Sequence, residues 1–125
     1  MGVSVLLADD HAVSRGSVRA DLEECGYLIC AEVGDAGAAV EAAVREHPDI
    51  ALLDIRMPGD GLEAARLIHA QLPDTRVVML TVSRDEDDIR AAVAAGAVGY
   101  LLKDADAELI ASALAAVVAG EIVLP

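Results

Sequence analysis

Aromatic residues are almost absent from this chain. Its 125 residues include no Phe, no Trp and only two Tyr. A chain of this length corresponds to one domain and buries on the order of two thirds of its unfolded surface. Its core must therefore be built mainly from Ala, Val, Leu and Ile.

Positive charge is also scarce. The chain has 9 Lys and Arg residues against 22 Asp and Glu residues, which gives a formal net charge of −13 at pH 7. This excess argues against binding nucleic acid or an anionic membrane surface by this segment alone, and it suits cations or basic partner surfaces. The same negative field opposes a phosphorylated partner unless a cation first neutralises the site.

The sequence has few cysteines and no long apolar run. Cys25 and Cys30 have no further Cys or His grouped around them, so neither a disulfide framework nor a zinc site is indicated, and we expect two core or near-core thiols in a reducing compartment. No basic leader precedes Asp9, and no run reaches the roughly 18–20 apolar residues that span a bilayer. We expect a cytoplasmic protein without membrane contact.

Strand-like and helix-like segments alternate along the chain. The apolar runs predict strands over 3–8, 27–33, 49–53, 76–80 and 98–102, and the helical spacing predicts helices over 14–26, 35–47 (with Asp35 as N-cap), 61–72, 85–95 and 106–119. Strands joined by helices pair in parallel, and strands that are apolar throughout need cover on both faces. Five such units predict an α/β fold, a flavodoxin-like (βα)5 doubly wound parallel sheet with strand order 2-1-3-4-5.

A polar residue of a particular kind follows or ends four of these strands. Asp9 and Asp10 follow the first strand, Asp54 follows the third, Thr81 follows the fourth, and Lys103, the only lysine, follows the fifth. The carboxyl ends of parallel strands share one edge, and ligands bind in the crevice there. We therefore expect three carboxylates, a hydroxyl and an ammonium to converge on one site.

These groups suit a site for a divalent cation and a phosphoryl group together. Mg²⁺ prefers oxygen ligands and keeps several waters, so one or two carboxylates plus substrate oxygens suffice. A carboxylate such as Asp54 can act as a nucleophile and form an acyl phosphate. A hydroxyl and an ammonium can stabilise the phosphoryl oxygens. Each residue alone has an ordinary structural explanation, such as a cap or a solvated turn, so only the combination indicates such a site.

The motifs that contain these residues resemble a known family. "LLADDH", "LLDIRMPGDGLE", "VVMLTVS" and "GYLLKD" match, in order and spacing, the receiver domain of two-component response regulators. The resemblance covers essentially the whole chain. The segments "AGAVGYLLKDA" and "VVAGEIVLP" are most similar to the NarL/FixJ subfamily, whose receivers normally precede a LuxR-type helix-turn-helix domain.

The resemblance implies a role for seven residues. These are Asp54 as phosphoacceptor; Asp9, Asp10, Asp54 and the backbone carbonyl of Arg56 as Mg²⁺ ligands; Thr81 and Lys103 as phosphoryl contacts; and Thr81 and Tyr100 as the conformational switch. A receiver of this kind catalyses its own phosphorylation and hydrolysis and is not a metabolic enzyme.

The resemblance also implies partners and a domain layout. A sensor histidine kinase would supply the phosphoryl group, and phosphorylation would promote a homodimer. Residues 1–120 would form the receiver and 121–125 the start of a linker, and DNA would be bound only through a C-terminal domain outside this chain, in transcription regulation.

Some positions depart from the commoner family pattern. The loop "MPGDG" at 57–61 is one residue shorter, and Asp104 stands where many receivers have proline, so the Lys103–Asp104 bond should be trans. Arg56 and Ser83 each lie two residues beyond a site residue, and the resemblance implies that such positions tune how fast the phosphoaspartate hydrolyses. We expect Arg56 to alter that rate. We expect the acidic run 85–88 to be a solvated helix start, and His11 to be a solvated loop residue rather than a metal ligand.

Two other classes of function stay open at this point. One is a pseudo-receiver that only binds proteins, which the complete set of acids, Thr and Lys disfavours. The other is an enzyme: a flavodoxin-like protein would need aromatic rings around a flavin, and a haloacid-dehalogenase-like phosphatase would need an Asp-x-Asp pair after the first strand. Mg²⁺-dependent labelling of Asp54 would distinguish all of them.

Overall fold

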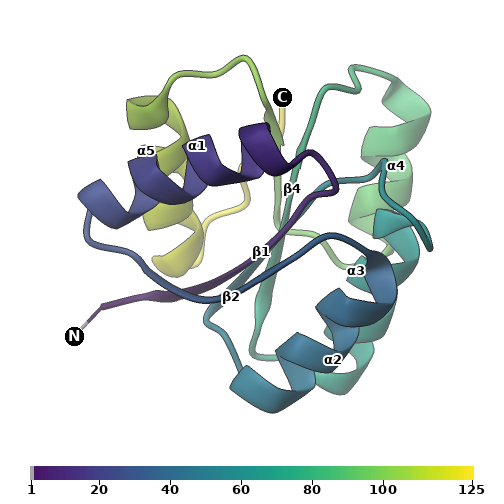
Figure 1. Cartoon of the computed structure of the whole chain (residues 1–125). Coiled ribbons are helices and arrows are strands. Elements are labelled where there is room, and N and C mark those ends of the chain that lie inside the picture. The colour runs from purple at the N-terminus through teal and green to yellow at the C-terminus, as the bar shows by residue number, and fades with distance from the viewer. Residues whose placement is uncertain (1) are drawn as a thin grey trace.

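The computed structural model describes residues 2–125 as a parallel five-stranded sheet between two layers of helices (Figure 1). The elements in chain order are β1 (Ser4–Ala8), α1 (Ala12–Glu24), β2 (Leu28–Val33), α2 (Ala36–Glu46), β3 (Ile50–Leu53), α3 (Gly61–Gln71), β4 (Arg76–Thr81), α4 (Glu86–Ala94), β5 (Gly99–Leu102) and α5 (Ala107–Val118). The strand order is β2-β1-β3-β4-β5, which confirms the predicted topology.

Helices cover both faces of the sheet, as the apolar strands required. Helices α1 and α5 lie on one face and α2, α3 and α4 on the other (Figure 1). Successive residues of β1 show the division, because Leu6 packs into the α2–α4 side whereas Val5 and Leu7 pack into the α1–α5 side. Aliphatic side chains predominate in both cores, and Tyr100 is buried in the core on the α2–α4 side.

Aspartate side chains begin four of the five helices. Those of Asp35, Asp60, Asp85 and Asp106 each accept a hydrogen bond from a backbone N–H in the first turn, and the cap predicted at Asp35 is confirmed. Helix α1 differs: it begins at Ala12 rather than at the predicted Ser14, after His11, whose side chain makes no capping bond. An uncapped start without acidic residues in the first turn leaves little in the sequence to mark that boundary.

The segment after α5 lies along the outer edge of β5, where the sequence indicated only a linker. Val123 forms a parallel bridge with Gly99; its N–H donates to the Val98 carbonyl (2.9 Å), and its carbonyl accepts from the Tyr100 N–H (2.9 Å). This contact covers part of an otherwise open strand edge.

The short loop between β3 and α3 turns by two successive residues of positive φ. Gly59 has φ 87° and Asp60 has φ 72°, and Gly61 then opens α3. A Cβ built on Gly61 would lie 1.8 Å from the carbonyl oxygen of Asp54, so only glycine fits there. No cis peptide bond occurs in residues 2–125, as expected for Lys103–Asp104.

Replacing Gly61 by alanine should therefore destabilise the fold. The clash involves backbone rather than a flexible side chain, so we expect a loss of about 3 kcal/mol in the free energy of unfolding, measured by urea denaturation. The matched control is Gly16→Ala, in the interior of α1 with open space around it, which should gain about 0.5–1 kcal/mol. Equal stability of the two variants would contradict the close approach at Gly61.

Candidate functional site

Asp9 and Asp54 meet at the carboxyl edge of the sheet because β1 and β3 are neighbours in register. Ala8 pairs with Leu53, the last residue of β3, and the N–H of Asp54 donates to the Ala8 carbonyl (2.9 Å). Both aspartates are buried, with 3% and 4% of their surface exposed. Two buried carboxylates this close require a positive partner.

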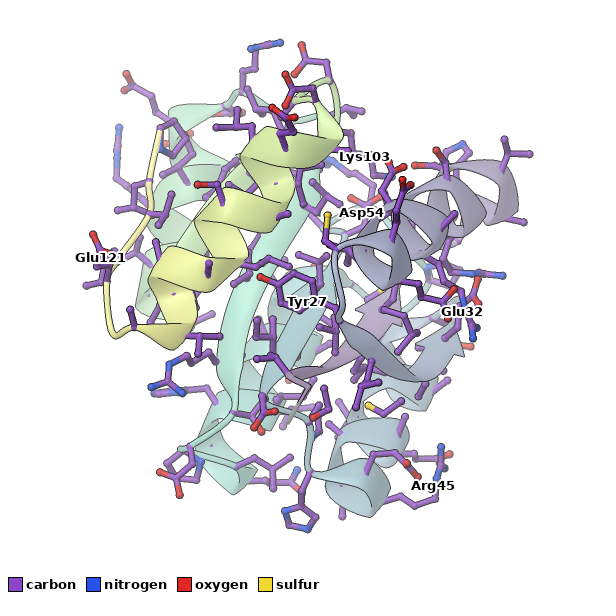
Figure 2. The ribbon with its side chains drawn as sticks, turned by 90° about the vertical axis from the view of Figure 1, so that its left-hand side faces the viewer. Tyr27, Glu32, Arg45, Asp54, Lys103 and Glu121 are labelled. Atoms are coloured by element: carbon purple, nitrogen blue, oxygen red, sulfur yellow. The ribbon has the colours of Figure 1, made fainter. Side chains whose placement is uncertain are left out.

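Lys103 supplies that positive partner. Its Nζ lies 2.7 Å from Oδ2 of Asp9 and 2.6 Å from Oδ2 of Asp54, and Figure 2 shows it directed toward Asp54. The lysine follows β5, and its N–H extends the ladder by donating to the Thr81 carbonyl (2.9 Å). Burial lowers the pKa of Lys103, but the hydrogen bonds to Asp54 and Asp9 and the negative charges of both together outweigh it. The pKa is therefore raised, and the ammonium stays charged.

The two buried carboxylates keep acceptor capacity for a cation. Oδ1 of Asp9 accepts from the His11 N–H (2.9 Å), and Oδ1 of Asp54 accepts from the Arg56 N–H (3.3 Å). Each carboxylate has about four lone-pair positions, so these bonds leave acceptor capacity unused. Asp10 is exposed, and one ligand atom from each of Asp9, Asp10 and His11 lies within 4.8 Å of the others. Carboxylate oxygens of this number fit Mg²⁺, a hard cation.

Thr81 ends β4, the strand between those of Asp54 and Lys103. Its side chain is fully buried, and its Oγ1 accepts from the Ser83 N–H (3.3 Å), which leaves the hydroxyl proton free to donate. Ser83 also joins Thr81 to Tyr100, whose buried hydroxyl donates to the Ser83 carbonyl (3.0 Å). Burial raises the pKa of Tyr100, so this hydroxyl stays protonated at neutral pH.

The structure thus brings three of the predicted residues into direct contact, namely Asp9, Asp54 and Lys103. Asp10 lies at the exposed rim, where its nearest ion-pair partner is His11 (Nδ1 to Oδ1, 3.7 Å). Arg56 contacts the site through its backbone, whereas its side chain points toward α4.

Sequence reasoning missed the ion pairs that hold the loop after β1. Arg15 Nη1 donates to the Asp9 carbonyl (2.6 Å) while its Nε donates to Glu32 (2.8 Å). Arg19 donates to the other oxygen of Glu32 (2.7 Å). The hydrogen bonds from Arg19 and Arg15 lower the pKa of Glu32. No local pattern could have identified this network, because Arg15 and Glu32 meet only when α1 packs beside β2.

The lowered pKa of Glu32 predicts a pH-dependent role in stability. A carboxylate whose pKa is lower in the folded than in the unfolded chain stabilises above its unfolded pKa, and that contribution is lost as pH falls through the folded pKa. Glu32→Gln should therefore reduce the urea midpoint at pH 7 and match the original chain at strongly acidic pH. The control is Glu41→Gln, an exposed residue of α2. A deficit that persists unchanged in acid would contradict this account.

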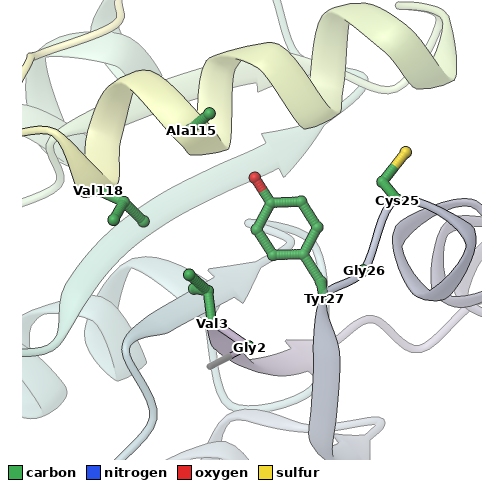
Figure 3. Close-up of a pocket in the computed structure, with 7 residues that line it drawn as sticks. All are labelled: Gly2, Val3, Cys25, Gly26, Tyr27, Ala115 and Val118. Carbon is green, nitrogen blue, oxygen red and sulfur yellow. The ribbon is translucent and has the colours of Figure 1, made fainter.

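An apolar hollow lies near the opposite end of the sheet, between the end of α1 and α5 (Figure 3). Its lining residues are Gly2, Val3, Cys25, Gly26, Tyr27, Ala115 and Val118. The Tyr27 hydroxyl donates to the Ala111 carbonyl (3.0 Å), so it is already satisfied. Cys25 is exposed at the end of α1 and Cys30 is half-buried, both as free thiols, so the expectation of a core or near-core position was wrong for Cys25. The hollow lacks the charged groups of the carboxyl edge.

Comparison with known proteins assigns the chain to a family. A profile of the response regulator receiver domain matches residues 5–115. The chain is 39% identical over 114 residues to the nitrate/nitrite response regulator NarP of Escherichia coli, covering 90% of this chain and 53% of NarP. It is 38% identical over 121 residues to the transcriptional regulatory protein LiaR of Bacillus subtilis, covering 95% and 57%. The chain thus spans just over half the length of these curated relatives.

Two solved structures similar to this chain are also of response regulators. The signal receiver domain of a NarL response regulator from Mycobacterium tuberculosis superposes with a TM-score of 0.92 at 33% identity, covering 96% of this chain and 98% of that one. A LuxR-family two-component response regulator from Aurantimonas gives 0.93 at 32% identity, covering 98% and 89%. The chain belongs to the response regulator receiver domain family, and its relatives are of the NarL and LuxR type. None of the helices in residues 2–125 is long and apolar enough to cross a bilayer.

Proposed function

We propose that this chain accepts a phosphoryl group from a sensor histidine kinase on Asp54, in a reaction that requires Mg²⁺. The observation that carries the proposal is the buried carboxylate of Asp54, directly after β3. Lys103 Nζ lies 2.6 Å from this carboxylate and also forms an ion pair with Asp9. A nucleophilic carboxylate, an adjacent acid for a cation and a fixed positive charge are the parts that phosphoryl transfer needs.

In the transfer, an oxygen of Asp54 attacks phosphorus in line with the leaving group. The new P–O bond forms as the P–N bond to the kinase imidazole breaks, and the electron pair leaves with the imidazole nitrogen, which is protonated by solvent. Mg²⁺ bound by Asp9, Asp10, Asp54 and the Arg56 carbonyl would supply charge neutralisation. Lys103 holds Asp54 in place beforehand and then offsets the added charge.

Thr81 and Tyr100 form the proposed response to phosphorylation. The free hydroxyl proton of Thr81 can donate to a phosphoryl oxygen, and the bond from Ser83 to Thr81 passes any movement to the loop before α4. Tyr100 contacts the same loop through the Ser83 carbonyl. A phosphoryl group on Asp54 that accepts from Thr81 would thus be connected, through Ser83 and Tyr100, to the surface around α4 and β5.

We extend the proposal to the domain layout, the oligomeric state and the contact with DNA. The receiver occupies residues 1–120, and 121–125 start a linker to a DNA-binding domain of the LuxR type. The matches cover only 53–57% of the curated relatives, which are named as response regulators and transcriptional regulators. Phosphorylation favours a homodimer. DNA is contacted by that second domain, in keeping with the net charge of −13 on this one.

Labelling with acetyl phosphate tests the proposal against a binding-only pseudo-receiver. The chain should gain one phosphoryl group, detected by intact-mass spectrometry, when Mg²⁺ is present and not when it is chelated. Asp54→Asn should abolish the label, because it removes the nucleophile. Asp74→Asn, an exposed acid in the loop before β4, is the matched control and should label normally. Absence of labelling in the original chain would instead favour the binding-only module, and full labelling of Asp54→Asn would rule out Asp54 as phosphoacceptor.

A further inference from the structure

Asp88 in the first turn of α4 connects three segments through one carboxylate oxygen. Its Oδ2 accepts from Arg56 Nη2 (3.1 Å) in the loop after β3 and from Ser83 Oγ (2.5 Å) in the loop after β4. The side chain is only 18% exposed, whereas those of Glu86 and Asp87 in the same turn are each 84% exposed. The expectation of a solvated acidic run was thus wrong at Asp88.

Arg56 lies where its charge could act on the phosphorylation site. Its N–H donates to Oδ1 of Asp54 (3.3 Å), so its side chain starts at the rim of the site. The guanidinium, however, is paired with Asp88 on α4. Lys103 is held by Asp9 and Asp54, and Arg84 is paired with Asp104. Arg15 also lies beside the site, but it is held by the Asp9 carbonyl and Glu32. Within residues 2–125 the Arg56 side chain is bound only to Asp88, so it can be released without breaking the buried cluster.

The negative net charge of the chain opposes the approach of a phosphodonor to Asp54, so a cation beside this residue affects the reaction rate. A phosphodonor is an anion, and it approaches a domain of net charge −13. A freed guanidinium at the rim would raise the local concentration of anions and the rate at which they reach Asp54.

We propose that Asp88 is a positioning residue that holds the Arg56 guanidinium on α4 and thereby slows the reaction of Asp54 with small anionic phosphodonors. This rests on the proposed function of Asp54. With acetyl phosphate, an Asp54 oxygen forms a bond to phosphorus while the bond from phosphorus to the acetyl oxygen breaks, and the electron pair leaves as acetate. Arg56 and Ser83 both donate to Oδ2 of Asp88, so the bond from Ser83 holds this oxygen where it accepts from Arg56.

The test compares Asp88→Asn with Asp87→Asn. Both changes remove one negative charge from the first turn of α4, so they alter the net charge and the interaction with the helix dipole equally. Asp87 pairs with Arg90 of the same helix and not with Arg56. We expect the second-order rate constant for labelling by acetyl phosphate to be about two- to fivefold higher in Asp88→Asn, the range an exposed ion pair supports. The difference should shrink as salt is added.

Two further comparisons separate positioning from a purely structural effect. In an Arg56→Ala background, Asp88→Asn and Asp87→Asn should label at the same rate, because the charge that Asp88 restrains is gone. The side-chain Nε of Arg56 should lose order in ¹⁵N relaxation measurements in Asp88→Asn and keep it in Asp87→Asn. This second readout needs only a folded chain and no phosphodonor.

Each contrary outcome has a distinct meaning. Equal labelling of the two single variants, or an advantage of Asp88→Asn that survives Arg56→Ala, would overturn the positioning role while leaving Asp54 as phosphoacceptor. An Arg56 side chain that stays ordered in Asp88→Asn would overturn it as well. If the original chain takes no label with Mg²⁺ present, the proposed function fails and the role of Asp88 fails with it.

Discussion

The ammonium of Lys103, held between the carboxylates of Asp9 and Asp54, is the interaction on which the rest of the site depends. The parallel sheet places two buried acids side by side at one edge, and their mutual repulsion must be offset. Removing one partner of a buried ion pair typically costs about 3–5 kcal/mol, because a desolvated charge stays behind. A lysine suits the position because its compact charge can sit 2.6–2.7 Å from an oxygen of each acid at once.

The scaffold around that charge cluster is built from backbone constraints. The ladder between β1 and β3 sets the spacing of the two acids, and the close approach of Gly61 to the Asp54 carbonyl fixes the loop beyond them. Arg15 holds the loop after β1 through the Asp9 carbonyl. The acids are thus held in place before any cation or phosphoryl group arrives, which lowers the cost of binding either one.

Much of the fold could be predicted because its determinants are local. Apolar runs of strand length, helical spacing and turn residues identify each of the ten elements within a few positions, and their alternation fixes a parallel sheet. The strand ends then indicate which edge holds Asp9, Asp54 and Lys103. The weakest boundary was the start of α1, which lacks a side-chain cap.

The unpredicted features all depend on how separate elements meet. The contact of Arg15 with Glu32 needs α1 beside β2, and that of Arg56 with Asp88 needs the loop after β3 beside α4. The pairing of Val123 with β5 depends on where α5 releases the chain. Such contacts have no periodicity in the sequence, and acidic residues are so frequent here that Asp88 could not be told apart from its solvated neighbours.

A crystal structure of this chain with Mg²⁺ and the phosphomimetic BeF3⁻ would test the proposed site most sharply. We expect one metal ion bound by Asp9 and Asp54, with the fluoride complex attached to Asp54 and in contact with Lys103 Nζ and the Thr81 hydroxyl. Metal and fluoride bound elsewhere, or Lys103 turned away from both, would contradict the claim that these groups form one phosphoryl-accepting site.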